Sequence, residues 1–201
     1  TEEIVATQRE VVLTLGEVVE TRSKETAQHV KRVAEYSYLL ALKAGLSEDR
    51  AQLLRMASPM HDVGKIGIPD SILFKPGKLT EEEFAVIKTH TVIGHSILKN
   101  SHRRIMRTAA TIALQHHERW DGTGYPHGLV EDETHVYGRI TALADVFDAL
   151  ACDRVYKKAW PLDEVIGYLR EQKGRQFDPL LTEIFLESMD EMLAIRARYP
   201  D

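Results

Sequence analysis

Two pairs of adjacent residues, His61-Asp62 and His116-His117, have the side chains best suited to binding metal ions. Neighbours on a helix point about 100° apart, so His61 and Asp62 do not chelate one ion, but Asp62 can bridge two ions while His61 binds one of them. His116-His117 follows an apolar helix face, where histidines need partners because burying an unpaired polar group is costly. Metal ligation is the favoured interpretation of His116-His117, whereas His61-Asp62 alone is equally consistent with a partly exposed helix end.

Five further residues carry side chains that could bind a metal ion. Glu25 and His29 lie four residues apart and emerge on one face of a helix, although such a pair alone is more typical of a solvated surface. His90 lies between the two adjacent pairs in the sequence. Asp145 and Asp148 stand three apart in an otherwise apolar run, where a carboxylate requires a cation or a buried arginine. These positions extend the set of candidate ligands well beyond one pair.

The candidates together are five histidines and three or four carboxylates, which exceeds the coordination shell of one ion, so the sequence predicts two or three metal ions. The ligand set offers nitrogen and oxygen without sulfur, because Cys152 is the single cysteine. Such a set favours Fe or Mn over Mg or Ca. Two ions about 4 Å apart activate water and stabilise in-line displacement at phosphorus, so the expected chemistry is hydrolysis of a phosphate ester.

Helices must position these ligands, because apolar residues recur at helical spacing and no segment shows the alternation of a strand. The patterns predict helices over residues 2–21, 23–44, 47–60, 91–99, 103–118, 137–151, 162–173 and 180–196. Thr80 and Glu83 form a capping box that begins one more helix. The glycine-rich segments 63–78 and 121–128 are predicted loops. We expect an all-α helical bundle with a polynuclear metal site where loops meet helix ends.

The composition restricts the class of protein. With 201 residues, 43% of them hydrophobic and 28% charged, the chain fits one globular domain with a short helical extension. No apolar run approaches the roughly 18 residues of a membrane span. The net charge of −5 argues against binding duplex nucleic acid but is compatible with a small anionic ligand. The single cysteine suits a reducing cytoplasm, and the start at Thr1 without methionine predicts a piece of a longer protein.

Several motifs occur in one order along the chain. They are His61-Asp62 with Gly64-Lys65, Gly67-Ile68-Pro69-Asp70, Lys75-Pro76-Gly77, His116-His117-Glu118 and Asp121-Gly122-Thr123-Gly124-Tyr125-Pro126. Together they resemble the HD-GYP family, a branch of the HD-domain metal phosphohydrolases that degrades cyclic di-GMP. The resemblance covers roughly residues 23–180, and the joint occurrence of the motifs is highly specific although no single motif is.

The resemblance implies a role for each matching position. The implied metal ligands are Glu25, His29, His61, Asp62, His90, His116, His117 and Asp145. The presence of both Glu25 and His29 is similar to the members that hold a third ion. Asp62 and Lys65 are the implied catalytic residues, because Lys65 matches the lysine near the scissile phosphate, where its charge stabilises developing negative charge.

The same resemblance implies a substrate-binding set. Gly124, Tyr125 and Pro126 match the signature triplet, in which the tyrosine contacts the dinucleotide. Arg154 and Lys157 match the basic pair that holds ligand phosphates, although without the family both are solvated charges past a helix end. One stretch departs from the family, because Glu131 stands at a glycine position and residues 134–135 replace an Ile-Pro pair. The conformation after Gly128 is therefore open.

The expected activity is metal-dependent cleavage of cyclic di-GMP, by in-line attack of metal-bound hydroxide, to linear pGpG and in some members on to GMP. Two alternatives stay open: a receptor that binds the dinucleotide with little turnover, and a general HD phosphohydrolase acting on other phosphoesters. Residues 23–201 are expected to form the phosphodiesterase domain. Residues 1–22 are expected to form a connector helix to an upstream sensor or receiver domain, and this helix is a candidate for homodimerisation. Its apolar stripe is Ile4, Val11, Leu15 and Val18.

Overall fold

The computed structural model describes residues 2–22, 26–153 and 158–201. Apart from two isolated bridges, the described residues contain no strand, and the predicted all-α class is confirmed. The helices are α1 (Glu2–Glu20), α2 (Ala27–Lys43), α3 (Glu48–Ala57), α4 (Asp70–Leu73), α5 (Glu81–Lys88), α6 (His90–Leu98), α7 (Arg104–Gln115), α8 (Val136–Ala151), α9 (Leu162–Gln172), α10 (Pro179–Glu187) and α11 (Met189–Arg198). Three short 3-10 turns, η1 (Ser58–Met60), η2 (Val63–Gly67) and η3 (Glu131–Glu133), connect them.

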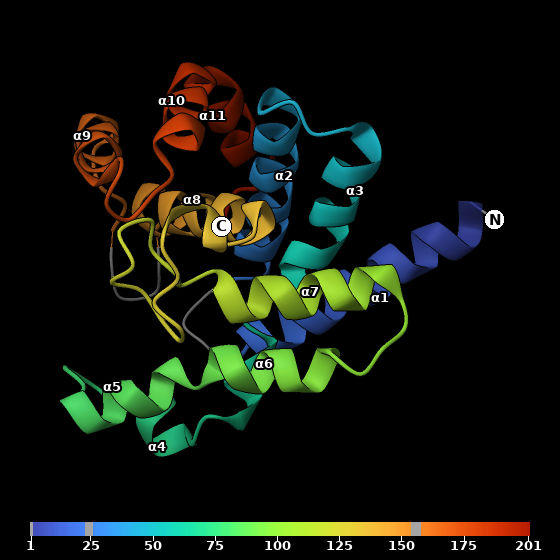
Figure 1. Cartoon of the computed structure of the whole chain (residues 1–201), viewed down its shortest axis with the longest axis vertical. Coiled ribbons are helices and arrows are strands. Elements are labelled where there is room, and N and C mark those ends of the chain that lie inside the picture. Colours follow the sequence, from blue (N-terminus) through green and yellow to red (C-terminus); the bar gives the residue numbers. More distant parts are fainter. Residues whose placement is uncertain (1, 23–25, 154–157) are drawn as a thin grey trace.

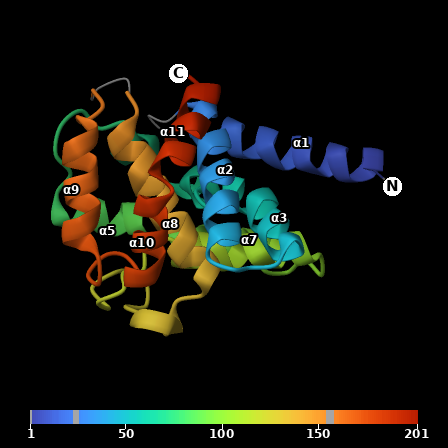
Figure 2. The same ribbon diagram turned by 90° about the horizontal axis from the view of Figure 1, so that it is seen from above.

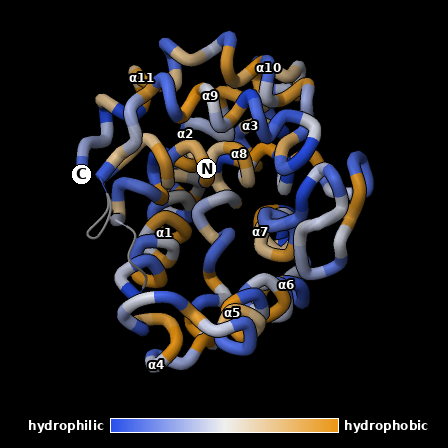
Figure 3. Tube along the Cα trace, turned by 90° about the vertical axis from the view of Figure 1, so that its left-hand side faces the viewer, coloured by the Kyte–Doolittle hydropathy of each residue, from blue (hydrophilic) through white to orange (hydrophobic). Residues whose placement is uncertain are grey.

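The helices form layers. Helices α9, α10 and α11 lie on one side of α2 and α8, while α7 and α1 lie on the other, followed by α6, α5 and α4 (Figures 1 and 3). Tyr36 and Leu40 on α2 and Phe147 on α8 are fully buried, and the Tyr36 and Phe147 rings meet edge to face at 5.2 Å. These residues belong to a core that joins α2 to α8 and continues into α3, α7, α9, α10 and α11.

Local signals set several helix ends. The Thr80–Glu83 capping box begins α5, and the Ser47 hydroxyl accepts a hydrogen bond from the first turn of α3. Gly45 ends α2 near a left-handed φ of 83°, as its position predicts. Several predicted elements differ in length or continuity. The helix predicted over 47–60 ends at Ala57, and residues 103–118 form a helix only as far as Gln115. Residues 180–196 divide between α10 and α11 at Ser188, and the predicted loop 63–78 contains η2 and the one-turn helix α4.

Helix α1 packs through a different face from the predicted stripe. Ile4, Val11, Leu15 and Val18 are each at least half exposed, whereas Val12 and Val19 are buried. The first part of α1 extends beyond the bundle (Figure 2), and its last part lies against η1 and α2. Among the described residues, no helix combines the length and apolarity needed to cross a membrane.

Candidate metal centre

His61 and Asp62 lie between η1 and η2, both buried. Nδ1 of His61 lies 2.8 Å from the backbone oxygen of Ser58, which can only accept, so Nδ1 carries the proton and Nε2 is directed into the site. The next turn passes very close to α6. A Cβ at Gly64 would lie 1.8 Å from the backbone oxygen of His90, so only glycine permits this approach. The motif glycine thus brings Asp62 next to His90.

A first donor set joins Asp62 to three histidines. One ligand atom from each of Asp62, His90, His116 and His117 lies within 4.8 Å of the others. Oδ1 of Asp62 is 3.2 Å from Nε2 of His90 and 3.5 Å from Nε2 of His116. Oδ1 of Asp62 is buried without a hydrogen-bond partner. The arrangement thus brings together four of the predicted ligands, while His61 belongs to a second set.

The backbone decides which nitrogen of each ring faces this set. Nδ1 of His90 lies 2.7 Å from the Ile87 oxygen, and Nδ1 of His116 lies 3.1 Å from the Ile112 and Ala113 oxygens. Each Nδ1 therefore donates, which leaves Nε2 of each ring directed at the Asp62 carboxylate as the atom that could bind a metal ion. A cation between these nitrogens and the carboxylate would be bound by all of them, so these residues fit a metal ion.

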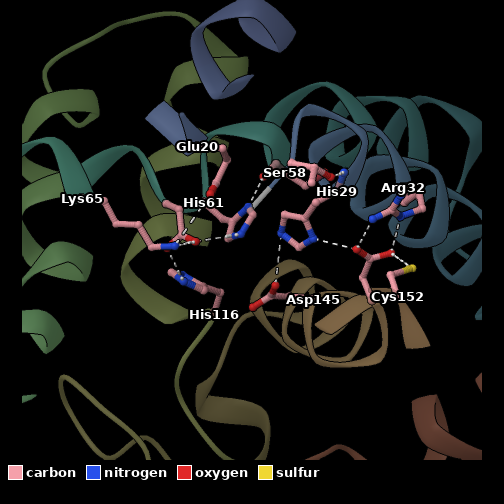
Figure 4. Close-up of polar contacts among 12 residues, drawn as sticks. Glu20, His29, Arg32, Ser58, His61, Lys65, His116, Asp145 and Cys152 are labelled. Atoms are coloured by element: carbon pink, nitrogen blue, oxygen red, sulfur yellow. Dashed lines mark hydrogen bonds and ion pairs between the residues drawn. The ribbon is translucent and has the colours of Figure 1, made fainter. Parts of the chain in front are cut away.

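A second donor set adjoins the first. One ligand atom from each of Glu20, His29 and His61 lies within 4.8 Å of the others, and all three residues are buried. Nε2 of His29 is also 3.4 Å from Oδ1 of Asp145, which is half-buried. The two sets meet at His61 and Asp62, whose Nε2 and Oδ2 are 3.3 Å apart. Figure 4 shows Glu20, His29, His61 and Asp145 pointing toward one another from separate elements.

Asp148 serves a different purpose from Asp145. Its carboxylate accepts hydrogen bonds from Nε and Nη2 of Arg32 at 2.7 and 3.0 Å, and it lies 2.8 Å from Nδ1 of His29. Burial of Asp148 favours its neutral form, but the His29 and Arg32 contacts outweigh this and lower the pKa of Asp148 to about 2. The buried arginine that the sequence left as an alternative for one of the two aspartates is Arg32.

The electrostatics of the site favour cations. Burial of the His61 ring opposes protonation, but the neighbouring Asp62 carboxylate outweighs it and raises the pKa of His61 to about 10. Burial also lowers the pKa of His116, and it lowers the pKa of His117 well below its usual value. Burial therefore favours the neutral form of His116 and His117 in the first donor set, which is the form that binds metal. The negative potential that raises the pKa of His61 also favours a metal ion.

Lys65 lies at the edge of both donor sets. Its Nζ is 2.6 Å from Oδ2 of Asp62 and 3.9 Å from Oε2 of Glu20. Burial of Asp62 would raise the pKa of its carboxyl, but the Lys65 and His61 charges hold that pKa well below its usual range. The predicted catalytic pair Asp62 and Lys65 is thus in direct contact.

The predicted substrate triplet borders the first donor set. The Tyr125 ring stacks on His117 with centroids 4.8 Å apart and an interplanar angle of 23°. A Cβ at Gly124 would lie 2.4 Å from the Arg119 nitrogen, so glycine permits the loop to close over this turn. The Glu118 carboxylate accepts hydrogen bonds from the backbone N–H groups of His127 and Leu129 at 2.8 and 3.0 Å. Glu118 therefore holds the backbone that directly follows the triplet.

The loop after Gly128 resolves the question that the sequence left open. Glu131, at the position where the family has glycine, adopts a φ of 51°, in the left-handed region that favours glycine. A left-handed backbone is thus present at this position although the residue is glutamate. His135 ends this segment by accepting a hydrogen bond from the Tyr137 nitrogen at the start of α8.

The sequence did not identify Glu20 as a member of the site. Glu20 lies on the packed face of α1, at helical spacing from Val12 and Gly16, and a charged residue on that face is the signal that could have revealed it. The predicted residues Glu25, Arg154 and Lys157 lie outside the described residues.

Comparisons with known proteins agree with these motifs. A family model described as HD domain matches residues 14–181. The chain is 51% identical over 195 residues to 3'3'-cGAMP-specific phosphodiesterase 2 of Vibrio cholerae, covering 97% of this chain and 37% of that protein. It is 43% identical over 197 residues to the cyclic di-GMP phosphodiesterase response regulator RpfG of Xanthomonas campestris pv. campestris, covering 98% of this chain and 52% of that protein. The chain thus spans about half or less of these relatives.

Solved structures share the fold at low identity. The structure of a cyclic GMP-AMP specific phosphodiesterase of V. cholerae superposes with a TM-score of 0.66 at 15% sequence identity. The match covers 96% of this chain and 54% of that phosphodiesterase chain. The HD domain of the L. monocytogenes phosphodiesterase PgpH was solved in complex with cyclic-di-AMP, and it superposes with a TM-score of 0.61 at 20% sequence identity. The match covers 94% of this chain and 98% of the PgpH domain. The chain belongs to the HD domain family, and its motifs and relatives place it in the HD-GYP branch of that family.

Proposed function

We propose that this chain hydrolyses cyclic di-GMP in a reaction that depends on bound divalent cations. One observation carries the proposal. The ligand atoms of Asp62, His90, His116 and His117 converge within 4.8 Å, and the buried Oδ1 of Asp62 has no hydrogen-bond partner. The names of the two relatives described above, both phosphodiesterases of cyclic dinucleotides, support the substrate class.

The residues fit two or three divalent cations, with Fe or Mn favoured because the donors are nitrogen and oxygen. When bound, such ions supply Lewis acidity toward the phosphoryl oxygen and lower the pKa of an attacking water. The proposed ligands are Glu25, His29, His61, Asp62, His90, His116, His117 and Asp145, of which Glu25 lies outside the described residues.

The remaining proposed roles concern the substrate. Lys65 stabilises the negative charge that develops at the scissile phosphate, because its ammonium group lies 2.6 Å from Asp62 at the edge of both donor sets. Tyr125 contacts the dinucleotide from its position on the His117 ring, and Gly124 and Pro126 set the turn that places it. Arg154 and Lys157 hold a phosphate of the ligand.

The first product is linear pGpG, because cleavage of one phosphodiester opens the ring. A second cleavage at the same centre would give GMP. A relative with 51% identity is named as specific for 3'3'-cGAMP, so hydrolysis of cyclic di-GMP and of 3'3'-cGAMP should be compared under the same conditions.

The test uses protein purified without air, its metal content measured by elemental analysis, and multiple-turnover hydrolysis followed by chromatography with Fe²⁺ or Mn²⁺. We expect many turnovers of cyclic di-GMP and a complete loss of turnover in Asp62→Ala. Retained hydrolysis in metal-replete Asp62→Ala would exclude the proposed site. Tight binding without turnover would favour a receptor, and faster hydrolysis of mononucleotide esters would favour a general phosphohydrolase.

The setting of the domain in its protein is also a proposal. We assign α1 as the connector to an upstream sensor or receiver domain, and we place the protein in the cytoplasm. The exposed stripe of α1 is assigned as a homodimer contact, and it consists of Ile4, Val11, Leu15 and Val18. Light scattering should give the mass of a dimer that becomes a monomer in Val11→Lys. A monomer in the unsubstituted chain would rule out this contact.

A further inference from the structure

Glu20 is the last residue of α1, yet it is 2% exposed and lies within the second donor set rather than on the surface. Its carboxylate and the ring nitrogens of His29 and His61 lie within 4.8 Å of one another. Figure 4 shows the Glu20 side chain pointing from α1 toward His61 and Lys65. The three residues come from three separate elements, so this grouping is a product of the tertiary structure.

Packing of the helix backbone fixes where Glu20 lies. A Cβ at Gly16 would lie 2.6 Å from the backbone oxygen of Pro59 and 3.1 Å from Cγ1 of Val30. Glycine therefore lets α1 approach η1 and α2 closely, and Glu20 follows one turn later on the same face. Glu17 adds an ion pair with Lys31 of α2 at 3.1 Å. The Glu20 carboxylate therefore lies near His29 and His61 because the backbone of α1 packs closely against η1 and α2.

The balance of charge around this set favours a cation. The carboxylates of Glu20 and Asp62 are buried and that of Asp145 is half-buried. Lys65 lies closer to Asp62 at 2.6 Å than to Glu20 at 3.9 Å. Arg32, the nearby buried guanidinium, forms ion pairs with Asp148 and Asp201 outside this set. Nε2 of His61 is buried and makes no hydrogen bond. A carboxylate and two imidazoles together are suitable ligands for Fe or Mn.

We propose that Glu20 is the carboxylate ligand of a cation bound by His29 and His61, so that the N-terminal helix is part of the metal centre. The inference rests on the metal-dependent function proposed above and adds a ligand at a position other than Glu25. Cation binding then holds the last turn of α1 against η1. The position of this helix and the occupancy of the site are thereby coupled.

The experiment titrates Mn²⁺ into metal-free protein and measures stoichiometry and affinity by calorimetry, without substrate. Removing a direct ligand costs at least as much as removing an outer-shell partner, so Glu20→Gln should weaken one Mn²⁺ site by about tenfold or more. The matched control is Glu10→Gln, an exposed glutamate on the same helix, which should bind Mn²⁺ like the unsubstituted chain. Unchanged affinity and stoichiometry in Glu20→Gln would overturn the proposal, as would a loss confined to Glu25→Gln.

A second measurement needs no substitution. Mn²⁺ should slow amide hydrogen exchange in the last turn of α1 in the unsubstituted protein, and the absence of this protection would also overturn the proposal. Hydrolysis of cyclic di-GMP is measured separately. Activity of the unsubstituted chain together with normal Mn²⁺ binding by Glu20→Gln would reject only the role of Glu20. Weakened binding by Glu20→Gln in a chain without activity would support the ligand and reject the proposed reaction.

Discussion

His29 and Asp148 are 119 residues apart in the sequence, and Nδ1 of His29 lies 2.8 Å from Oδ2 of Asp148. The contact directs Nε2 of His29 toward Asp145 and the second donor set. Partners of this kind orient a ligand ring and raise its basicity, so they affect metal binding without touching the metal.

Asp148→Asn should therefore weaken Mn²⁺ binding by about 10- to 100-fold, because the amide removes the charge that holds the His29 ring. Calorimetric titration of the metal-free protein gives the affinity. The control is Asp190→Asn, at an exposed position in α11, which should leave the Mn²⁺ affinity unchanged. Wild-type affinity in a folded Asp148→Asn protein would show that the contact does not matter for metal binding.

Asp148 should also make the stability of the metal-free protein depend on acid pH. Its pKa is about 2 in the folded chain and about 3.9 when unfolded, so the carboxylate form stabilises the fold by roughly 2 kcal/mol. Because the folded pKa is lowered, this contribution is complete above about pH 4 and is lost as the pH falls toward 2. Urea unfolding should show that the free energies of unfolding of the unsubstituted chain and Asp148→Asn become more similar as the pH falls through this range. A difference in free energy that stays constant with pH would contradict the lowered pKa of Asp148.

Glu118→Gln should loosen the loop that carries Tyr125 while leaving the metal ions bound. The substituted amide can accept only through its oxygen, so one of the buried N–H groups of His127 and Leu129 loses its acceptor, at a cost of about 1–3 kcal/mol. We expect a higher KM for cyclic di-GMP with unchanged Mn²⁺ affinity. Asp132→Asn, an exposed site in η3, is the comparison. A fall in metal affinity instead would place Glu118 in the metal centre.

Gly64→Ala should destabilise the fold by more than about 3 kcal/mol, because its Cβ would lie 1.8 Å from the His90 backbone and cannot be accommodated without moving α6. Thermal unfolding measures the change. Gly167→Ala in α9 is the matched control, since a Cβ there meets nothing within 4 Å, and it should be neutral or stabilise by up to about 1 kcal/mol. Equal melting temperatures for the two variants would contradict the packing of η2 on α6.

Local sequence was sufficient for most of the fold because caps and apolar periodicity act within one or two turns. The capping box at Thr80 and the glycine after α2 are examples. The face of α1 that packs could not be read this way. The more apolar stripe through Val11 and Val18 is exposed, and the face with Gly16 is chosen because it permits close approach to Pro59. That choice depends on a neighbouring backbone that periodicity does not describe.

The sequence by itself determined the donor types, the helical class and the family, because adjacent pairs such as His116-His117 and the ordered motifs are visible without coordinates. Only the tertiary structure decided which atoms meet. It separated Asp145, facing the donor set, from Asp148, paired with Arg32, and it brought Glu20 beside His61. The physical reason is that a ligand set is a property of distances between helices, and those distances are set by core packing between residues far apart in the chain.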